Sequence, residues 1–138
     1  MKKITKATLI LTLTLILCLT SITASASEPT EISPRLSHIV ENRFTFVASS
    51  SGGDFYAKYT GLDSFARADI HVKVEKSFLF FFWSDAGEWS SSSTNRSGSF
   101  SHVFSLSGSG TYRATITLTV TGTNGTTDTV TETITSKY

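Results

Sequence analysis

Apolar and polar side chains alternate without a break along residues 112–121 of this 138-residue chain. The apolar members are Tyr112, Ala114, Ile116, Leu118 and Val120, and threonine occupies most positions between them. A period of two residues places successive side chains on opposite faces of a β-strand, whereas an α-helix would distribute them around its axis. This segment therefore predicts a strand with one face in an apolar core and the other in water.

Shorter segments with the same pattern occur elsewhere in the chain, and none shows a sustained helical period. Strands are predicted over residues 43–47, 55–59, 68–75, 100–106 and 127–135, together with an apolar run over 78–83. We expect Asp85–Glu88 to form a turn and the serine-rich stretch 90–99 to be a mobile loop. The prediction is an all-β protein, a two-sheet antiparallel sandwich of six or seven strands.

The N-terminus has the pattern of an export signal. Three lysines in the first six residues precede an uncharged apolar run that ends in Ala24-Ser25-Ala26, the small-residue pattern of a cleavage site. We expect residues 1–26 to be a secretory signal peptide, 27–37 an extended segment that holds both prolines, and 38–138 the folded domain. Cys18 follows a bulky leucine, which disfavours lipid attachment at that cysteine. The expected product is secreted, without stable membrane insertion after cleavage.

Charge and composition exclude several classes of function. The chain has 12 Lys and Arg against 11 Asp and Glu, and three of the lysines lie in the predicted signal peptide. The remaining chain is slightly acidic, so it lacks the clustered basic surface expected of a nucleic-acid-binding protein. The single cysteine also lies in the signal peptide, so the core must form without a disulfide. Ten Phe, two Trp and four Tyr supply the apolar surface for that core.

Two segments near the C-terminus carry a resemblance to a known family. Gly110-Thr111-Tyr112 opens the alternating strand, and Asn124-Gly125 leads into a last threonine-rich strand. This pattern resembles the last two strands of PKD-type immunoglobulin-like domains. In the wider immunoglobulin-like fold the tyrosine hydroxyl bonds back to the chain upstream. The Asn-Gly pair also suits the positive φ angles of a tight hairpin.

The resemblance implies an immunoglobulin-like β-sandwich, with structural roles for Gly110, Tyr112, Asn124 and Gly125. The chain is also similar to small, uncharacterised secreted proteins of Gram-positive bacteria with one such sandwich. PKD-like domains imply contact with a partner such as a cell-wall glycan or a surface protein.

No constellation of residues points to catalysis or to a metal. Asp69, His71 and Glu75 share one face of a predicted strand, but Lys73 lies among them and repels a cation. The chain has no Gly-x-Ser-x-Gly nucleophile motif, and nothing selects a pair of catalytic carboxylates. We therefore expect no enzyme, no metal and no cofactor.

The aromatic region Phe78–Trp89 is the best candidate for a binding site. A strand with phenylalanine on both faces is either buried on both faces or exposes one face to a partner. The candidate ligand-binding residues are Trp83, Trp89, Asp85 and Glu88, and we expect Trp83 to be buried and Trp89 partly exposed. The leading hypothesis is a secreted non-catalytic binding or cell-envelope-associated protein. The alternative is a secreted antagonist, bacteriocin-like or an inhibitor, that acts through this aromatic region.

Overall fold

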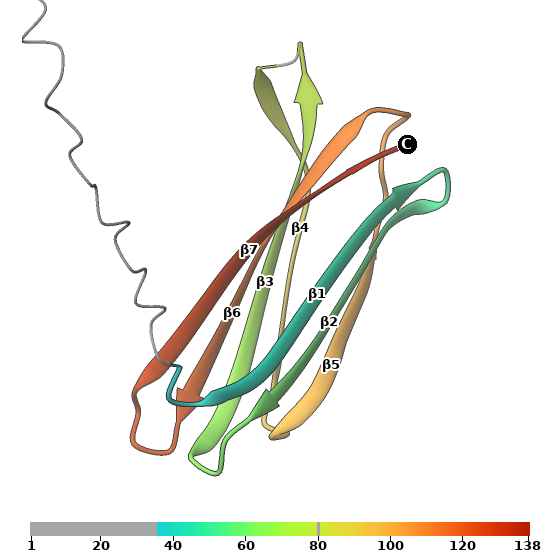
Figure 1. The fold of residues 1–138 in the computed structure, drawn as a ribbon. Coiled ribbons are helices and arrows are strands. Elements are labelled where there is room, and N and C mark those ends of the chain that lie inside the picture. The colour runs from blue at the N-terminus through green and yellow to red at the C-terminus, as the bar shows by residue number, and fades with distance from the viewer. Residues whose placement is uncertain (1–35, 80) are drawn as a thin grey trace, which may run out of the picture. The chain divides into compact units, whose positions relative to one another are not determined.

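The computed structural model describes residues 36–79 and 81–138, and within them the chain forms seven β-strands and no helix (Figure 1). The strands are β1 (Ile39–Ser49), β2 (Gly52–Gly61), β3 (Phe65–Phe78), β4 (Phe82–Ser93), β5 (Ser97–Phe104), β6 (Thr111–Gly122) and β7 (Thr127–Lys137). This part of the chain holds no helix of the length and hydropathy needed to cross a bilayer. The predicted signal peptide and most of the predicted extended segment 27–37 lie outside the described residues.

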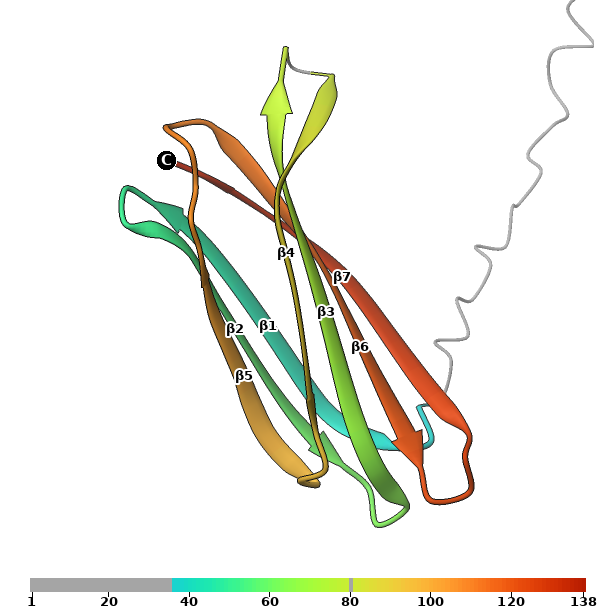
Figure 2. The same cartoon turned by 180° about the vertical axis from the view of Figure 1, so that it is seen from behind.

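The strands pair antiparallel in two sheets. One sheet has three strands in the order β1-β2-β5, and the other has four in the order β4-β3-β6-β7. Figures 1 and 2 show the two sheets from opposite sides. The predicted two-sheet antiparallel all-β fold is confirmed, with seven strands.

The alternation in the sequence corresponds to the division between core and surface. In β6 every second residue from Tyr112 to Gly122 is buried, and the residues between them are half-buried. The three-stranded sheet supplies mostly rings to the core: Phe44, Phe46, Phe55, Tyr59, Phe100 and Phe104. The four-stranded sheet supplies mostly aliphatic side chains: Ile70, Val72, Val74, Ile116, Leu118 and Val120. Each sheet therefore buries one face against the other, as in a sandwich.

The reversal between β3 and β4 does not lie where the sequence suggested. The chain turns between Phe78 and Phe82, which pair across the hairpin, and the predicted turn Asp85–Glu88 lies within β4. Val74 pairs with Gly87 and Glu75 with Asp85, so Ala86 is the extra residue of a β-bulge. The prediction of a turn at Asp85–Glu88 was wrong because a bulge and a turn share the same small and polar residues.

The serine-rich stretch 90–99, expected to be a mobile loop, is mostly strand. β4 continues to Ser93 and β5 begins at Ser97, which leaves three residues to connect them. Ser90 pairs with His71 and Ser92 with Asp69. Pairing with a neighbouring strand decides the conformation here, because strand preference depends strongly on context.

Candidate functional site

The turn between β3 and β4 exposes a cluster of apolar side chains. Phe78, Leu79, Phe81 and Phe82 are 60%, 65%, 84% and 66% exposed, and we call these four residues the hairpin tip. At about 200 Å² for a side chain of this size, they present roughly 500 Å² of apolar surface. The largest apolar patch on an ordinary monomer covers about 300–600 Å² and is often functional. The hairpin tip therefore has the size of a binding surface.

The hairpin tip extends past the sandwich because β3 and β4 continue beyond their neighbours. Pairing of β3 with β6 ends at Lys76 and Tyr112, whereas pairing of β3 with β4 continues to Phe78 and Phe82. Figure 1 shows this end of the hairpin standing clear of the other strands. The hairpin tip thus leaves the sandwich before it can contribute to the core.

Trp83 lies just behind the hairpin tip, on the outer face of the four-stranded sheet. Its ring stacks with the guanidinium of Arg113 from β6, whose Cζ lies 4.2 Å from the ring centroid. Trp83 is half-buried by this contact. A guanidinium over an aromatic face is a favourable cation–π pair, worth about 0.5–1 kcal/mol at an exposed site.

Trp89 lies on the opposite face of β4, between the two sheets. Its ring stacks on His102 at a centroid distance of 4.9 Å, and it also packs against Phe55 and Phe100 at 6.0 and 6.5 Å. Half-buried like Trp83, Trp89 closes the open edge of the core between β4 and β5. The expected partial exposure of Trp89 is therefore confirmed, whereas the expected burial of Trp83 was wrong, because both rings are half-buried.

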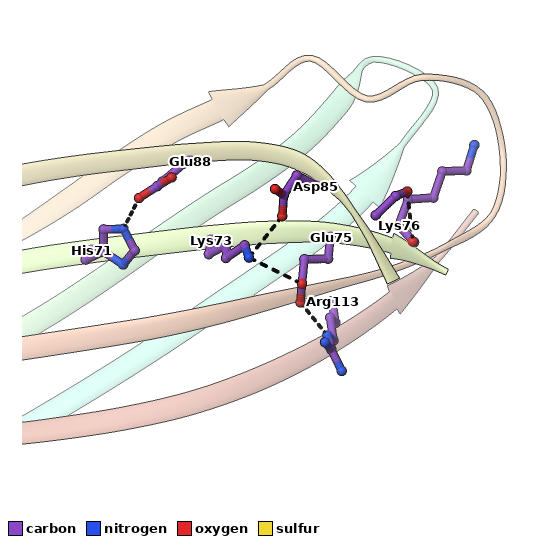
Figure 3. A network of polar contacts seen from close by, with 8 residues as sticks. His71, Lys73, Glu75, Lys76, Asp85, Glu88 and Arg113 are labelled. Atoms are coloured by element: carbon purple, nitrogen blue, oxygen red, sulfur yellow. Dashed lines mark hydrogen bonds and ion pairs between the residues drawn. The ribbon is translucent and has the colours of Figure 1, made fainter. Parts of the chain in front are cut away.

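Asp85 and Glu88 lie on the outer face of the four-stranded sheet, and each pairs with a side chain of β3 (Figure 3). Asp85 accepts from the ammonium of Lys73 at 2.9 Å, and Glu88 contacts Nε2 of His71 at 2.6 Å. Both carboxylates are more than half exposed. The structure therefore gathers Trp83, Asp85 and Glu88 on one face and separates them from Trp89.

A chain of alternating charges crosses this outer face behind Trp83 (Figure 3). Asp85 pairs with Lys73, Lys73 lies 3.5 Å from Glu75, and Nε of Arg113 donates to Glu75 at 2.7 Å. The hydrogen bond from Arg113 lowers the pKa of Glu75 below its ordinary 4.5. The hydrogen bond to Asp85, together with attraction to both carboxylates, raises the pKa of Lys73 above its ordinary 10.5. These shifts favour the charged forms of Glu75 and Lys73 at neutral pH.

A shallow, open depression of about 390 Å³ lies farther along the same face, lined by polar side chains that include Arg67, Asp69, His71 and Thr117. Nε of Arg67 donates to Asp69 at 2.8 Å, and His71 pairs with Glu88. Within the described residues, no group of three or more histidines, cysteines and acids lies close enough together to hold a metal ion. Asp69, His71 and Glu75, considered from the sequence as metal ligands, each have a different protein partner instead.

Gly110 and Tyr112 lie at the entry to β6. Tyr112 is fully buried, and its hydroxyl donates to the carbonyl oxygen of Gly108 at 2.7 Å, with that of Ser107 at 3.0 Å. Gly110 has a φ of +152°, and a Cβ there would meet Cε of Lys76 at 2.9 Å. The tyrosine hydroxyl thus holds the β5–β6 connection against the start of β6, as the resemblance implied.

Asn124 and Gly125 form the turn between β6 and β7, with only one residue at positive φ. Gly125 has a φ of +80°, while Asn124 does not adopt a positive φ. The side-chain oxygen of Asn124 instead accepts from the backbone N–H of Thr126 at 3.1 Å and from its hydroxyl at 2.7 Å. The turn therefore uses asparagine as a side-chain acceptor, and the expected pair of positive φ angles is not present.

One buried polar cluster was not singled out from the sequence. His38 is 3% exposed; its Nδ1 lies 2.8 Å from the hydroxyl of Ser64 and its Nε2 lies 2.7 Å from that of Thr126. Its backbone N–H donates to the carboxylate of Asp128. His38 thereby ties the start of β1 to the β2–β3 and β6–β7 turns. No local pattern marks it, because its partners lie far away in the sequence.

No protein-family model matches the chain, and no curated protein matches it at a significant level. Among solved structures, the chain is similar to the crystal structure of a family 76 glycoside hydrolase from a bovine Bacteroides thetaiotaomicron strain. The sequence identity is 13% and the TM-score is 0.39. The match covers 72% of this chain and 20% of the hydrolase chain, so this chain spans about a fifth of that protein. A likeness this low supports no inference about activity.

Proposed function

We propose that this chain is a secreted, non-catalytic immunoglobulin-like domain that binds a component of the cell envelope through the β3–β4 hairpin. The observation that carries the proposal is the exposure of Phe78, Leu79, Phe81 and Phe82 at the end of a projecting hairpin. Covering these four side chains removes no polar side chain from water, and it gains about 25 cal/mol for each Å² of apolar surface buried. An exposed apolar patch of this size is often a binding surface.

Strand order and the tyrosine contact support the immunoglobulin-like part of the proposal. In variable-type immunoglobulin domains, a strand that follows the third strand is added beside it on the sheet that holds the last two strands. β4 lies in that position, beside β3 on the sheet with β6 and β7. The hydrogen bonds of the Tyr112 hydroxyl to the chain four and five residues upstream are a second feature of the same class.

The pairing of polar side chains supports a non-catalytic role. The charged groups of the outer face, including His71, Glu75 and Glu88, are engaged with one another in ion pairs and hydrogen bonds. A catalytic acid, base or nucleophile needs a partner group arranged toward a bound substrate. Secretion is supported by the N-terminal sequence pattern alone.

A double variant of the hairpin tip tests this proposal. Labelled protein is incubated with isolated bacterial cell envelopes, sedimented and quantified for the wild type, Phe81→Ser/Phe82→Ser, and Val47→Ser/Val103→Ser. The second pair removes the same number of exposed apolar residues, 56% and 60% exposed, from the three-stranded sheet. We expect the wild type and the valine variant to sediment and the phenylalanine variant to stay in solution. Equal sedimentation of all three would overturn the assignment of the hairpin as the binding element.

A secreted antagonist is the second candidate, and the same exposed hairpin tip favours it. An antagonist differs from an adherent protein in damaging its target, so release of a trapped dye from liposomes separates the two. Dye release that disappears in Phe81→Ser/Phe82→Ser would favour the antagonist. Adherence without release would favour the binding protein.

A further inference from the structure

The hairpin tip is apolar on every side. Eight consecutive residues, Ser77 to Ser84, carry no charge. Side chains alternate between the faces of the hairpin, so Phe78 and Phe82 share one face and Trp83 lies on the other, beside Arg113. A flat protein partner would cover only one of these faces. A fluid apolar medium covers all of these faces without a binding pocket of complementary shape.

Polarity increases in steps from the tip toward the sandwich. Behind the four exposed apolar residues lies Trp83, stacked on Arg113, and then Lys76, whose ammonium donates to the carbonyl of Ser107. This order follows the polarity of a bilayer from hydrocarbon through the interface to the phosphates. Tryptophan is enriched at the level of the lipid headgroups, and long basic side chains extend along apolar surface while keeping their charge in water.

The length of the projecting segment and its backbone bonding both suit shallow insertion. From Lys76 to the turn is about three residues, roughly 10 Å at 3.3 Å per residue, and interfacial segments are buried by about 5–10 Å. Backbone groups in an apolar medium need internal partners. In the projecting segment the N–H of Phe81 donates to the carbonyl oxygen of Leu79 at 2.8 Å, and Phe78 pairs with Phe82, but among the described strands β3 has no neighbour on its other side beyond Lys76. The backbone groups on these outer edges need water, which restricts the segment to the interface.

We infer that the hairpin tip inserts into the interfacial region of a lipid bilayer and anchors the domain reversibly at a membrane surface. This inference rests on the proposed function, because it names the partner of the same hairpin. Behind the tip, Lys73 and Arg113 pair with two carboxylates, Glu75 and Asp85, and Lys76 adds a third cation that is bonded to the carbonyl of Ser107 instead. With one net positive charge, this region makes anionic lipid a minor contributor, and burial of the apolar tip dominates the binding.

Sedimentation with lipid vesicles tests the inference. The full chain is expressed, and the form that accumulates is purified for the wild type, Phe81→Ser/Phe82→Ser and Val47→Ser/Val103→Ser. Each is mixed with vesicles of phosphatidylcholine alone or of phosphatidylcholine with phosphatidylglycerol. We expect the wild type to bind both, with the phenylalanine variant partitioning at least about tenfold less and the valine variant within about twofold of the wild type, because affinity follows buried apolar area. Thermal unfolding of each variant verifies that all three are equally folded.

Tryptophan emission gives a second measurement that reports on the inserted segment itself. Trp83 lies next to the tip, and Trp89 packs between the sheets. Adding vesicles should shift the emission of the wild type to the blue. Trp83→Phe should remove this shift while retaining vesicle binding. A shift that persists in Trp83→Phe would contradict insertion at the tip.

The remaining outcomes separate this inference from the proposed function. If the wild type ignores both kinds of vesicle but still binds envelopes through Phe81 and Phe82, the lipid inference fails and the proposed function stands. If the wild type forms a dimer in analytical ultracentrifugation that Phe81→Ser/Phe82→Ser dissolves, and does not bind vesicles, the tip is a contact between copies of the chain and the lipid inference is overturned. If the phenylalanine variant binds vesicles and envelopes as the wild type does, both the lipid inference and the proposed function fail.

Discussion

The guanidinium of Arg113 lies over the ring of Trp83, 4.2 Å from its centroid, while its Nε donates to Glu75 at 2.7 Å. One side chain of β6 therefore contacts both strands of the β3–β4 hairpin just where β6 stops pairing with β3. This contact supports the base of the projecting segment. It also links the charged outer face to the apolar tip.

The pH dependence of stability should report the bond between Arg113 and Glu75. Because the folded-state pKa of Glu75 is lowered, its contribution is present above pH 4.5 and is lost as the pH falls below 4.5 through the folded value. The difference in unfolding free energy between the wild type and Glu75→Gln should therefore be greatest near neutral pH and shrink on acidification. Urea unfolding at a series of pH values measures it. Replacing Arg113 by Gln should remove most of this difference in unfolding free energy. A difference that stays constant with pH would contradict the bond between Arg113 and Glu75.

Tyr112→Phe should destabilise the domain by about 1–2 kcal/mol, because the carbonyl group of Gly108 loses a buried hydrogen-bond donor. Thr117→Ser on the outer face of the same strand is the control and should stay within about 0.5 kcal/mol of the wild type. Chemical denaturation measures both variants. An unchanged unfolding midpoint for Tyr112→Phe would show that the hydroxyl contributes nothing to the fold.

The two tryptophans should differ when each is truncated. Trp89→Ala should cost about 3 kcal/mol, at the lower end of the range for a packed tryptophan, because its ring contacts Phe55, Phe100 and His102. Trp83→Ala should cost about 1 kcal/mol or less, the value of an exposed cation–π pair. Urea unfolding followed by far-UV circular dichroism compares them. The opposite order of stabilities would contradict the placement of Trp89 between the sheets.

Gly122→Ala should displace His38, because a Cβ at position 122 would overlap the imidazole ring. We expect a loss of about 1–3 kcal/mol, the usual cost of overpacking. In a His38→Ala background the same substitution should cost less, since the imidazole is gone and only the side-chain oxygen of Asn124, 2.8 Å from the added Cβ, still obstructs it. A double-mutant cycle by chemical denaturation measures this coupling. Additive effects of the two substitutions would show that Gly122 does not accommodate His38.

Export should remove the first 26 residues, so that the secreted protein begins Ser27-Glu28-Pro29. N-terminal sequencing of the protein in culture medium checks the position. Recovery of an acylated Cys18 in the membrane fraction would replace this prediction with a lipoprotein.

The strands were predictable from local sequence because burial on one face imposes a period of two on each strand. Tyr112 to Val120 is the clearest case, and β6 shows that alternation along its whole length. Ser90–Ser99 was not predictable in this way. Those serines become strand because β3 and β2 lie beside them, and no residue within the stretch records that pairing.

The faces on which the two tryptophans of the candidate site lie depend on Ala86, which no sequence pattern marks as a bulge. In an unbroken strand, Trp83 and Trp89 would lie on the same face, because they are six positions apart. The bulge at Ala86 adds one residue to β4 and reverses the alternation beyond it. Trp83 therefore stacks outside on Arg113, whereas Trp89 packs inside on His102.

The sequence by itself determined the all-β class and the inward faces of the main strands, since both follow from the spacing of apolar residues along a single segment. Only the tertiary structure decided that the four residues of the hairpin tip lie on the surface. The sequence of Phe78–Phe82 is as apolar as that of any core strand. Whether such a segment is buried depends on how far the neighbouring strands extend beside it. Because β6 starts at Thr111 and its pairing with β3 reaches only Lys76, the rest of the hairpin extends past the sandwich and exposes its rings.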